Sequence, residues 1–204
     1  MQSENKDVII VGAFHEMIEL CEECGYHIVG IIDNQKTGYF HNIPIIGSDV
    51  DGQEIFLNYG FCKLVITPDS PTIRKKLVDY YYSLGFDFAT VVSPRARISK
   101  SASIGLGAVI QDGANVSSSS TIGNFVKLNI NANVMHDNIV GDYTTIAPNA
   151  VLLGYVNIEQ CAYIGANSTI LPTIKIGGHS VVGAGAVVTR NVIKNTTVKG
   201  VPAK

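Results

Sequence analysis

Aliphatic residues recur at every sixth position through the second half of the chain, without a missed step or an inserted residue. If each position were aliphatic about a quarter of the time, sixteen successive matches would arise about once in four billion trials. This period predicts a parallel β-helix of about five triangular coils, in which each short strand directs its aliphatic residue into a stacked core. The sixteen positions are Ile98, Ile104, Ile110, Val116, Ile122, Leu128, Val134, Val140, Ile146, Leu152, Ile158, Ile164, Ile170, Ile176, Val182 and Val188.

A second row of positions, four places after the aliphatic ones, holds small residues. Small side chains at a regular offset permit the tight corners that such coils require. The small residues are Ala102, Ala108, Ala114, Ser120, Ala132, Ala150, Ala162, Ser168, Ser180 and Ala186.

Residues 7–92 follow a different pattern, in which short apolar runs alternate with helical ones. The runs DVIIVG, HIVGIID, KLVIT and FATVV predict strands, and HEMIELCEECG and PTIRKKLVDYYYSLG predict helices. This alternation indicates a small parallel α/β sheet of Rossmann type. Pro71 stands where a helix can begin, and Gly25 and Gly85 stand where helices end.

The change of pattern falls at the linker SPRAR, which starts at Ser93. We therefore expect two domains, with residues 1–93 forming a Rossmann-like domain and residues 94–204 a β-helix domain.

Composition narrows the class of protein. The 204 residues are 46% hydrophobic and 16% charged, as in a globular chain, and the formal net charge is −2. Lys and Arg are scattered, which argues against nucleic-acid binding. The first apolar run, after residue 7, is too short for a signal peptide or a membrane span, so we expect a cytoplasmic protein. The four cysteines form no disulfide framework, and Cys21 and Cys24 are expected to lie on a helix without a metal.

The end of the first predicted strand carries a nucleotide-binding pattern. Gly12 permits a tight strand-to-helix turn, and a helix N-terminus favours a diphosphate. Asp33 lies 21 residues further on, at the spacing that lets an acid reach a ribose hydroxyl. The plainer interpretation is a turn glycine and a strand-end aspartate. Binding of NAD is disfavoured because the chain lacks GxGxxG.

Hexads such as IGLGAV, IGNFVK, IGANST and IGGHSV resemble those of the hexapeptide-repeat acyltransferases, and this resemblance implies a left-handed β-helix. From VIIVGAFH to GVPAK, the whole chain resembles a narrower group. These are the bacterial N-acetyltransferases of nucleotide-linked 4-amino sugars and their sialic acid O-acetyltransferase relatives. In that group, the first domain holds the sugar nucleotide, and acetyl-CoA lies in a groove between β-helices, which implies a homotrimer.

The resemblance also assigns binding residues, position by position. Gly154 is the candidate whose backbone N–H would polarise the thioester carbonyl. Relatives usually carry two consecutive glycines before the histidine, whereas this chain has Ala13 and Phe14. The sugar-nucleotide contacts fall at Gly12, Ala13, Phe14, His15, Asp33 and Asn34, and the acetyl-CoA contacts fall at Thr145, Gly154, Ala166 and Ala184.

His136 and Asp137 interrupt the regular wall just after Val134, which places them near a coil corner. Acetyl transfer to an amine needs a base, because a protonated amine has no lone pair. Imidazole titrates near neutral pH, and a carboxylate on its far nitrogen fixes the tautomer. The resemblance puts the catalytic base at His136 and a neighbouring acid, usually glutamate, at Asp137. A corner histidine without chemistry is the plainer interpretation, and His179 is a competing candidate.

The sequence thus predicts transfer of an acetyl group from acetyl-CoA to the 4-amino group of a nucleotide-linked 4-amino-4,6-dideoxy sugar. The nucleotide, UDP, dTDP or GDP, stays open, and such sugars serve surface polysaccharide or glycoprotein synthesis. The alternatives are sialic acid O-acetylation and a non-catalytic scaffold. No metal is expected, because a carbonic-anhydrase site needs three histidine ligands and the repeats hold only His136 and His179.

Overall fold

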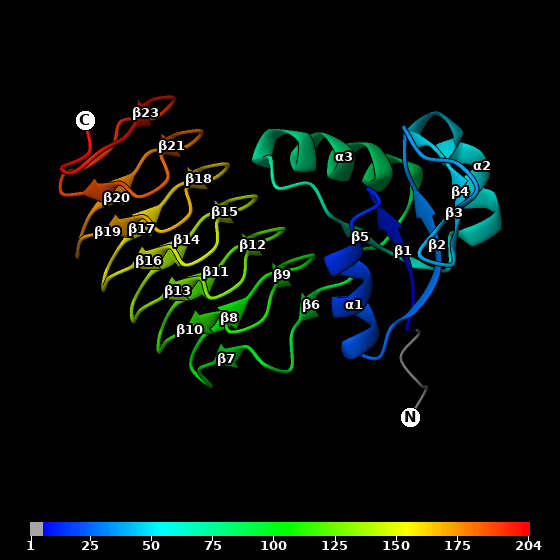
Figure 1. Ribbon diagram of the computed structural model, residues 1–204, viewed down its shortest axis with the longest axis horizontal. Coiled ribbons are helices and arrows are strands. Elements are labelled where there is room, and N and C mark those ends of the chain that lie inside the picture. Colours follow the sequence, from blue (N-terminus) through cyan, green and yellow to red (C-terminus); the bar gives the residue numbers. More distant parts are fainter. Residues whose placement is uncertain (1–5) are drawn as a thin grey trace. The chain divides into compact units, whose positions relative to one another are not determined.

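The computed structural model describes residues 6–204, which form two compact units (Figure 1). The first unit comprises the described residues up to Pro68 together with Ile73–Val91, and the second comprises Asp69–Thr72 and Val92–Lys204. Residues 1–5 of the predicted first domain lie outside the described residues. The predicted fold class, an α/β unit followed by a parallel β-helix, is confirmed.

The first unit is built on a five-stranded sheet with the order β3-β4-β2-β1-β5. Its strands pair in parallel except for β3, which runs antiparallel to β4 at the edge. Within the sheet, β2 lies on one side of β1, and β5 lies on the other side of β1. The carboxyl end of β1 is therefore a switch point, where open α/β sheets bind ligands. The strands are β1 (Asp7–Val11), β2 (His27–Ile32), β3 (Tyr39–Phe40), β4 (Ile43–Gly47) and β5 (Lys63–Ile66).

The helices of this unit begin and end near the predicted signals. Helix α1 (His15–Glu23) ends before Gly25, and α3 (Pro71–Leu84) begins at its proline and ends before Gly85. Both glycines have a positive φ, which a side chain would disfavour. The sequence patterns named no element between β2 and β5. The structure has β3, β4, η1 (Asp49–Asp51) and α2 (Gly52–Tyr59) there.

The second unit consists of two-residue strands, and the second residue of each strand in the hexad series is the predicted aliphatic one. Nearly all of these aliphatic residues are completely buried in one stacked core. The strands are β6 (Val91–Val92), β7 (Arg97–Ile98), β8 (Ser103–Ile104), β9 (Val109–Ile110), β10 (Asn115–Val116), β11 (Thr121–Ile122), β12 (Lys127–Leu128), β13 (Asn133–Val134), β14 (Ile139–Val140), β15 (Thr145–Ile146), β16 (Val151–Leu152), β17 (Asn157–Ile158), β18 (Tyr163–Ile164), β19 (Thr169–Ile170), β20 (Lys175–Ile176), β21 (Val181–Val182), β22 (Val187–Val188) and β23 (Thr197–Val198).

These strands form three parallel sheets, one along each side of the coil (Figure 1). Every third strand pairs with the next in its sheet, so that Val134 stands beside Leu152 and Ile164 beside Val182. Residues 18 positions apart are consequently neighbours in adjacent coils. This register decides which corner residues can meet.

The corners have a fixed conformation. The third residue after the aliphatic one has a positive φ in coil after coil, for example 58° at Asn131, 57° at Asp137 and 59° at Asn149. Asn and Asp adopt this left-handed region more readily than other residues with a side chain. Asp137 therefore suits its corner, and the residue before it, His136, lies on the turn as predicted.

The short segment Asp69–Thr72 lies against one sheet of the second unit. The Lys127 Nζ is 2.8 Å from the Asp69 Oδ1, and the Thr145 hydroxyl donates to the Asp69 carbonyl at 2.7 Å. The Lys127 side chain is only 3% exposed, so this ion pair holds a buried charge.

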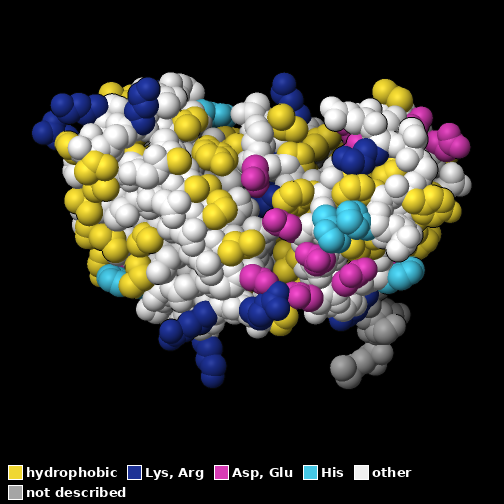
Figure 2. Space-filling model, in the orientation of Figure 1, with side chains coloured by type: hydrophobic (Ala, Val, Ile, Leu, Met, Phe, Trp, Pro, Cys, Tyr) yellow, Lys and Arg dark blue, Asp and Glu magenta, His cyan; other side chains and the backbone are white. Residues whose placement is uncertain are grey.

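The surface agrees with the charge pattern of the sequence. On the face that Figure 2 shows, Lys and Arg side chains are scattered rather than gathered into a patch. Within residues 6–204, no helix is long and apolar enough to cross a membrane.

Candidate functional site

His136 and Asp137 form a hydrogen-bonded pair on a corner of the β-helix. The His136 Nδ1 lies 2.8 Å from the Asp137 Oδ2, and their side chains are 47% and 38% exposed. Opposite an ionised carboxylate, Nδ1 carries the proton and donates it to Asp137. The other ring nitrogen, Nε2, is then an acceptor, so the pair can take up a proton there.

The corner of the next coil makes room for this imidazole. Gly154 stands 18 residues after His136, and a Cβ placed on it would lie 2.6 Å from the His136 Cε1 and 2.8 Å from its Nε2. The ring of Tyr155 meets the imidazole edge-on, with 5.4 Å between the ring centroids. Only glycine at 154 therefore lets the ring lie against the backbone.

In a typical hexad, the residue two places after the aliphatic one lies at a corner, and its backbone N–H can donate to a side chain. At several corners a side chain of an adjoining coil accepts its hydrogen bond, as at Leu106, Asn124, Ile130 and Gly178. Gly154, Ala166 and Ala184 occupy the same place in their hexads. In the part of the chain that the structure describes, their N–H groups have no acceptor. Because Gly154 is buried, this unpaired N–H beside His136 is costly unless a ligand uses it.

The structure separates the four residues that the resemblance assigned to acetyl-CoA. Gly154 lies beside His136, whereas Ala166 and Ala184 are stacked neighbours on a different corner, which follows β18 and β21. Thr145 is completely buried, and its hydroxyl donates to the Asp69 carbonyl, so its side chain holds the segment Asp69–Thr72.

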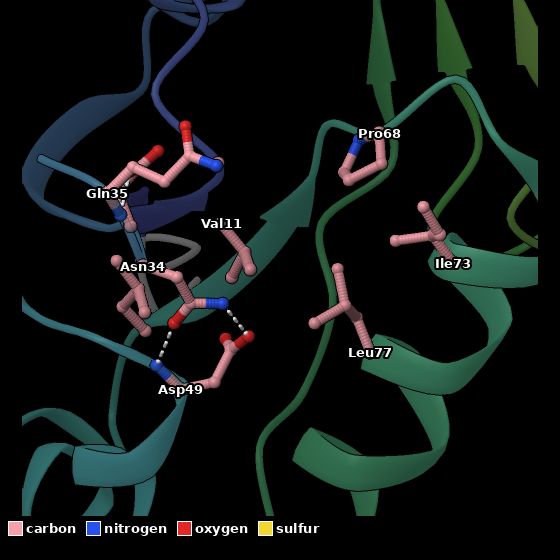
Figure 3. A pocket seen from close by; sticks show the side chains of 10 residues that line it. Val11, Asn34, Gln35, Asp49, Pro68, Ile73 and Leu77 are labelled. Atoms are coloured by element: carbon pink, nitrogen blue, oxygen red, sulfur yellow. Dashed lines mark hydrogen bonds between the residues drawn. The ribbon is translucent and has the colours of Figure 1, made fainter.

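A cavity of about 220 Å³ opens in the first unit at the carboxyl ends of β1 and β2. In Figure 3, Val11, Asn34 and Asp49 lie on one side of it, and Ile73 and Leu77 extend from α3 on the other side. Of the predicted nucleotide residues, Gly12, Asp33 and Asn34 line this cavity, and Ala13, Phe14 and His15 do not.

Gly12 closes one end of the cavity with a backbone shape that needs glycine. Its φ is +93°, and a Cβ would collide with the Thr67 hydroxyl. That hydroxyl donates to the Val11 carbonyl at 2.9 Å and therefore has little freedom to move away.

Asp33 is held by backbone donors on both carboxylate oxygens. Oδ2 accepts the N–H of Ala13 at 2.8 Å, and Oδ1 accepts those of Gln35 and Lys36 at 2.8 and 2.9 Å. Burial raises the pKa of Asp33, but these three hydrogen bonds and the charge of Lys36 outweigh it and lower the pKa below its usual value. A carboxylate has about four acceptor positions, so one stays open for a ligand hydroxyl.

Asn34 is fixed by Asp49, a residue that the sequence patterns gave no reason to select. Its amide donates to the Asp49 carboxylate at 2.6 Å and accepts the Asp49 N–H at 2.9 Å. The Tyr81 hydroxyl donates to the same carboxylate, and burial together with this hydrogen bond raises the Tyr81 pKa. Tyr81 therefore stays a neutral donor to Asp49.

The residues at the start of α1 lie outside this cavity. Phe14 is the residue before the helix and caps it without a side-chain hydrogen bond. His15 stacks on His41 from the turn between β3 and β4, with 3.7 Å between the ring centroids. Ile73, Leu77 and Gln35 line the cavity although the sequence gave no sign of it, because only the folded helix and loop bring them there.

Among residues 6–204, no group of three or more His, Cys, Asp or Glu side chains is placed to hold a metal ion. Cys21, on α1, is buried, and burial raises the pKa of its thiol to about 12. The thiol is therefore a packing residue rather than a nucleophile.

Comparison with known proteins identifies the repeats. The family model described as bacterial transferase hexapeptide (six repeats) matches residues 155–190. No curated protein matches the chain.

Solved structures match both units together. PerB from Caulobacter crescentus, in complex with CoA and GDP-perosamine, is 27% identical, with a TM-score of 0.91 over 97% of this chain and 96% of that one. The acetyltransferase domain of PglB from Neisseria gonorrhoeae, with acetyl coenzyme A, is 27% identical, with a TM-score of 0.91 over 98% of both chains. WeeI from Acinetobacter baumannii is 28% identical, with a TM-score of 0.86 over 97% of this chain and 98% of that one.

Residues 155–190 therefore carry the hexapeptide repeats of bacterial transferases. The two-unit fold, in which an α/β unit precedes the β-helix, is similar to the folds of PerB, the PglB acetyltransferase domain and WeeI.

Proposed function

We propose that this protein transfers the acetyl group of acetyl-CoA to the 4-amino group of a nucleotide-linked 4-amino-4,6-dideoxy sugar. The observation that carries the proposal is the His136–Asp137 pair beside the unpaired N–H of Gly154, in a chain that matches PerB along nearly its whole length. The structure of PerB holds CoA and GDP-perosamine, and that N-acetyltransferase also gives complexes when one histidine is replaced by alanine or asparagine.

The reaction assigned to the pair is direct attack of the amine on the thioester. The amine nitrogen forms a bond to the acetyl carbon and passes its proton to the His136 Nε2. Asp137 accepts the Nδ1 proton in a hydrogen bond and stabilises the imidazolium. The Gly154 N–H donates to the thioester oxygen as negative charge grows there. The C–S bond then breaks, and the leaving CoA thiolate takes the proton from the His136 imidazolium, which restores the neutral imidazole.

In this proposal the sugar nucleotide occupies the cavity of the first unit. Asp33 has one acceptor position free for a ribose hydroxyl, and the cavity lies at the switch point of the sheet. The fixed amide of Asn34 and the close approach to the Gly12 backbone complete its polar side. Acetyl-CoA and nucleotide sugars are cytoplasmic metabolites, in keeping with the expected location, and the product would serve surface polysaccharide or glycoprotein synthesis.

Release of CoA thiol from acetyl-CoA tests the proposal. The acceptors are UDP-, dTDP- and GDP-linked 4-amino sugars, with free sialic acid as the comparison. We expect turnover with one nucleotide amino sugar, which also identifies the nucleotide. Turnover with sialic acid alone would identify an O-acetyltransferase instead. No CoA release with any acceptor would contradict the proposal and favour a non-catalytic scaffold.

We also propose a homotrimer, because a thioester groove between β-helices needs neighbouring copies. The uncapped N–H groups of Ala166 and Ala184 follow one another along a corner and could line such a groove. Size-exclusion chromatography with light scattering should give the mass of three chains, each of 21.8 kDa. A monomer that still turns over at the same rate would contradict this assembly.

A further inference from the structure

Asn138 is a buried amide at a place that other coils fill with small or apolar side chains. It lies four residues after Val134, at the position that Ala132, Ala150 and Val156 occupy in their own hexads, and it has no exposed surface. A buried amide is costly unless its donors and acceptor are paired. Its presence beside His136 and Asp137 therefore calls for a physical reason.

The Asn138 side chain is bonded to the backbone of two coils. Its Nδ2 donates to the Met135 carbonyl at 2.9 Å and lies 3.4 Å from the Leu152 carbonyl. Its Oδ1 accepts the Val156 N–H at 2.6 Å. Met135 and Asn138 enclose His136 and Asp137, while Leu152 and Val156 enclose Gly154. The Asn138 amide thus connects the turn that carries His136 to the turn that carries Gly154.

Ser120, in the preceding coil, completes this arrangement. Its hydroxyl donates to the Met135 carbonyl at 2.7 Å and accepts the Asn138 N–H at 3.2 Å. An ordinary corner closes differently. The N–H of Ala132 donates directly to the Asn129 carbonyl at 3.0 Å, without any side chain. At the His136 corner, two side chains take the place of that backbone hydrogen bond and so determine the shape of the turn.

We propose that Asn138, supported by Ser120, is a positioning residue that sets the distance and angle between His136 and the N–H of Gly154. It touches neither substrate, and it acts through the backbone of the two turns. The inference rests on the proposed acetyl transfer only for its kinetic consequence, since the hydrogen bonds themselves belong to the free enzyme. A base and an oxyanion donor must be held to within a fraction of an ångström to act together.

The competing explanation is that Asn138 merely stabilises the β-helix. Thr144 provides a matched control, because it is a fully buried polar residue at the same hexad place, and its hydroxyl donates to the Glu159 carbonyl on another corner. Asn138→Leu removes the amide at nearly constant size, and Thr144→Val removes the hydroxyl in the same way. Both should lower Tm, but only the first should alter catalysis.

The kinetic experiment uses the full-length enzyme and the nucleotide amino sugar that it turns over. We expect Asn138→Leu to lower kcat about tenfold while the KM values for both substrates change less than twofold, and Thr144→Val to leave kcat within twofold. In a His136→Ala background, Asn138→Leu should lower the residual rate less than twofold, because the imidazole that Asn138 positions is then absent. An equal loss in both backgrounds, or a kcat like that of Thr144→Val, would overturn the proposal.

A measurement without substrate separates this inference from the proposed function. In protein labelled with ¹⁵N-histidine, the Nδ1–H signal of His136, assigned by its loss in His136→Ala, reports the hydrogen bond to Asp137. We expect it to persist in Thr144→Val and to shift or broaden in Asn138→Leu; an unchanged signal would overturn the positioning role even if no acceptor is turned over. Should Asn138→Leu not fold, Ser120→Ala is the second variant, with an expected two- to fourfold loss of kcat and the same change of signal.

Discussion

Replacing His136 with alanine should lower the rate of acetyl transfer about a hundredfold or more. The loss follows because the amine would have to release its proton to water while it attacks the thioester. The KM for acetyl-CoA should change little, since the imidazole lies at the reacting centre. Steady-state CoA release, measured with the accepted sugar nucleotide, checks this result.

His179→Ala is the matched control for that experiment. His179 also lies on a β-helix corner and has the same positive backbone φ, 57°, as Asp137. Its replacement should leave the rate within about threefold of the unaltered enzyme. Full activity in His136→Ala, or a larger loss in His179→Ala, would transfer the role of base to another group.

Gly12→Ala should destabilise the first unit by about 2–4 kcal/mol and weaken binding of the sugar nucleotide. The methyl group would meet the Thr67 hydroxyl, and the positive φ adds backbone strain of about 1–2 kcal/mol. Differential scanning calorimetry should show the transition of this unit several degrees lower. The KM for the sugar nucleotide should rise, while that for acetyl-CoA stays the same.

Gly38→Ala is the control that adds backbone strain at a positive φ without a collision like the one between a Cβ at position 12 and Thr67. Gly38 has a comparable φ of +76°, but nothing lies within 4 Å of a Cβ placed there. It should therefore cost only about 1 kcal/mol. If Gly12→Ala and Gly38→Ala lower the unfolding temperature equally, the contact with Thr67 is not what requires glycine at position 12.

The β-helix could be predicted from sequence because its rule is local and repeated. Each coil needs an aliphatic residue at one place and a compact corner at another, so Val134 and Leu152 are predictable from spacing alone. The same reasoning placed His136 on a corner. Gly154 was expected from the family resemblance alone, and the period of 18 residues explains why it lies beside His136.

The cavity of the first unit was less predictable, because its walls come from elements far apart in sequence. Gly12 and Asp33 follow strands and could be found, whereas Asp49 and Leu77 arrive from a short 3₁₀ turn and from α3. Thr145 shows the same limit, because its hydroxyl donates to the carbonyl of Asp69, which stands 76 residues earlier in the chain. Such contacts depend on tertiary structure and leave no periodic signal.

The register of 18 residues also limits how the length of this chain can change. His136 and Gly154 occupy successive coils, and the amide of Asn138 reaches only from one coil to the next. Insertion of a single residue between them would turn the aliphatic row outward. Insertion of a whole coil would keep the core intact but place a foreign corner between the imidazole and the N–H. The segment from 136 to 154 therefore cannot change in length, whereas added coils beyond β22 would leave the pair as it is.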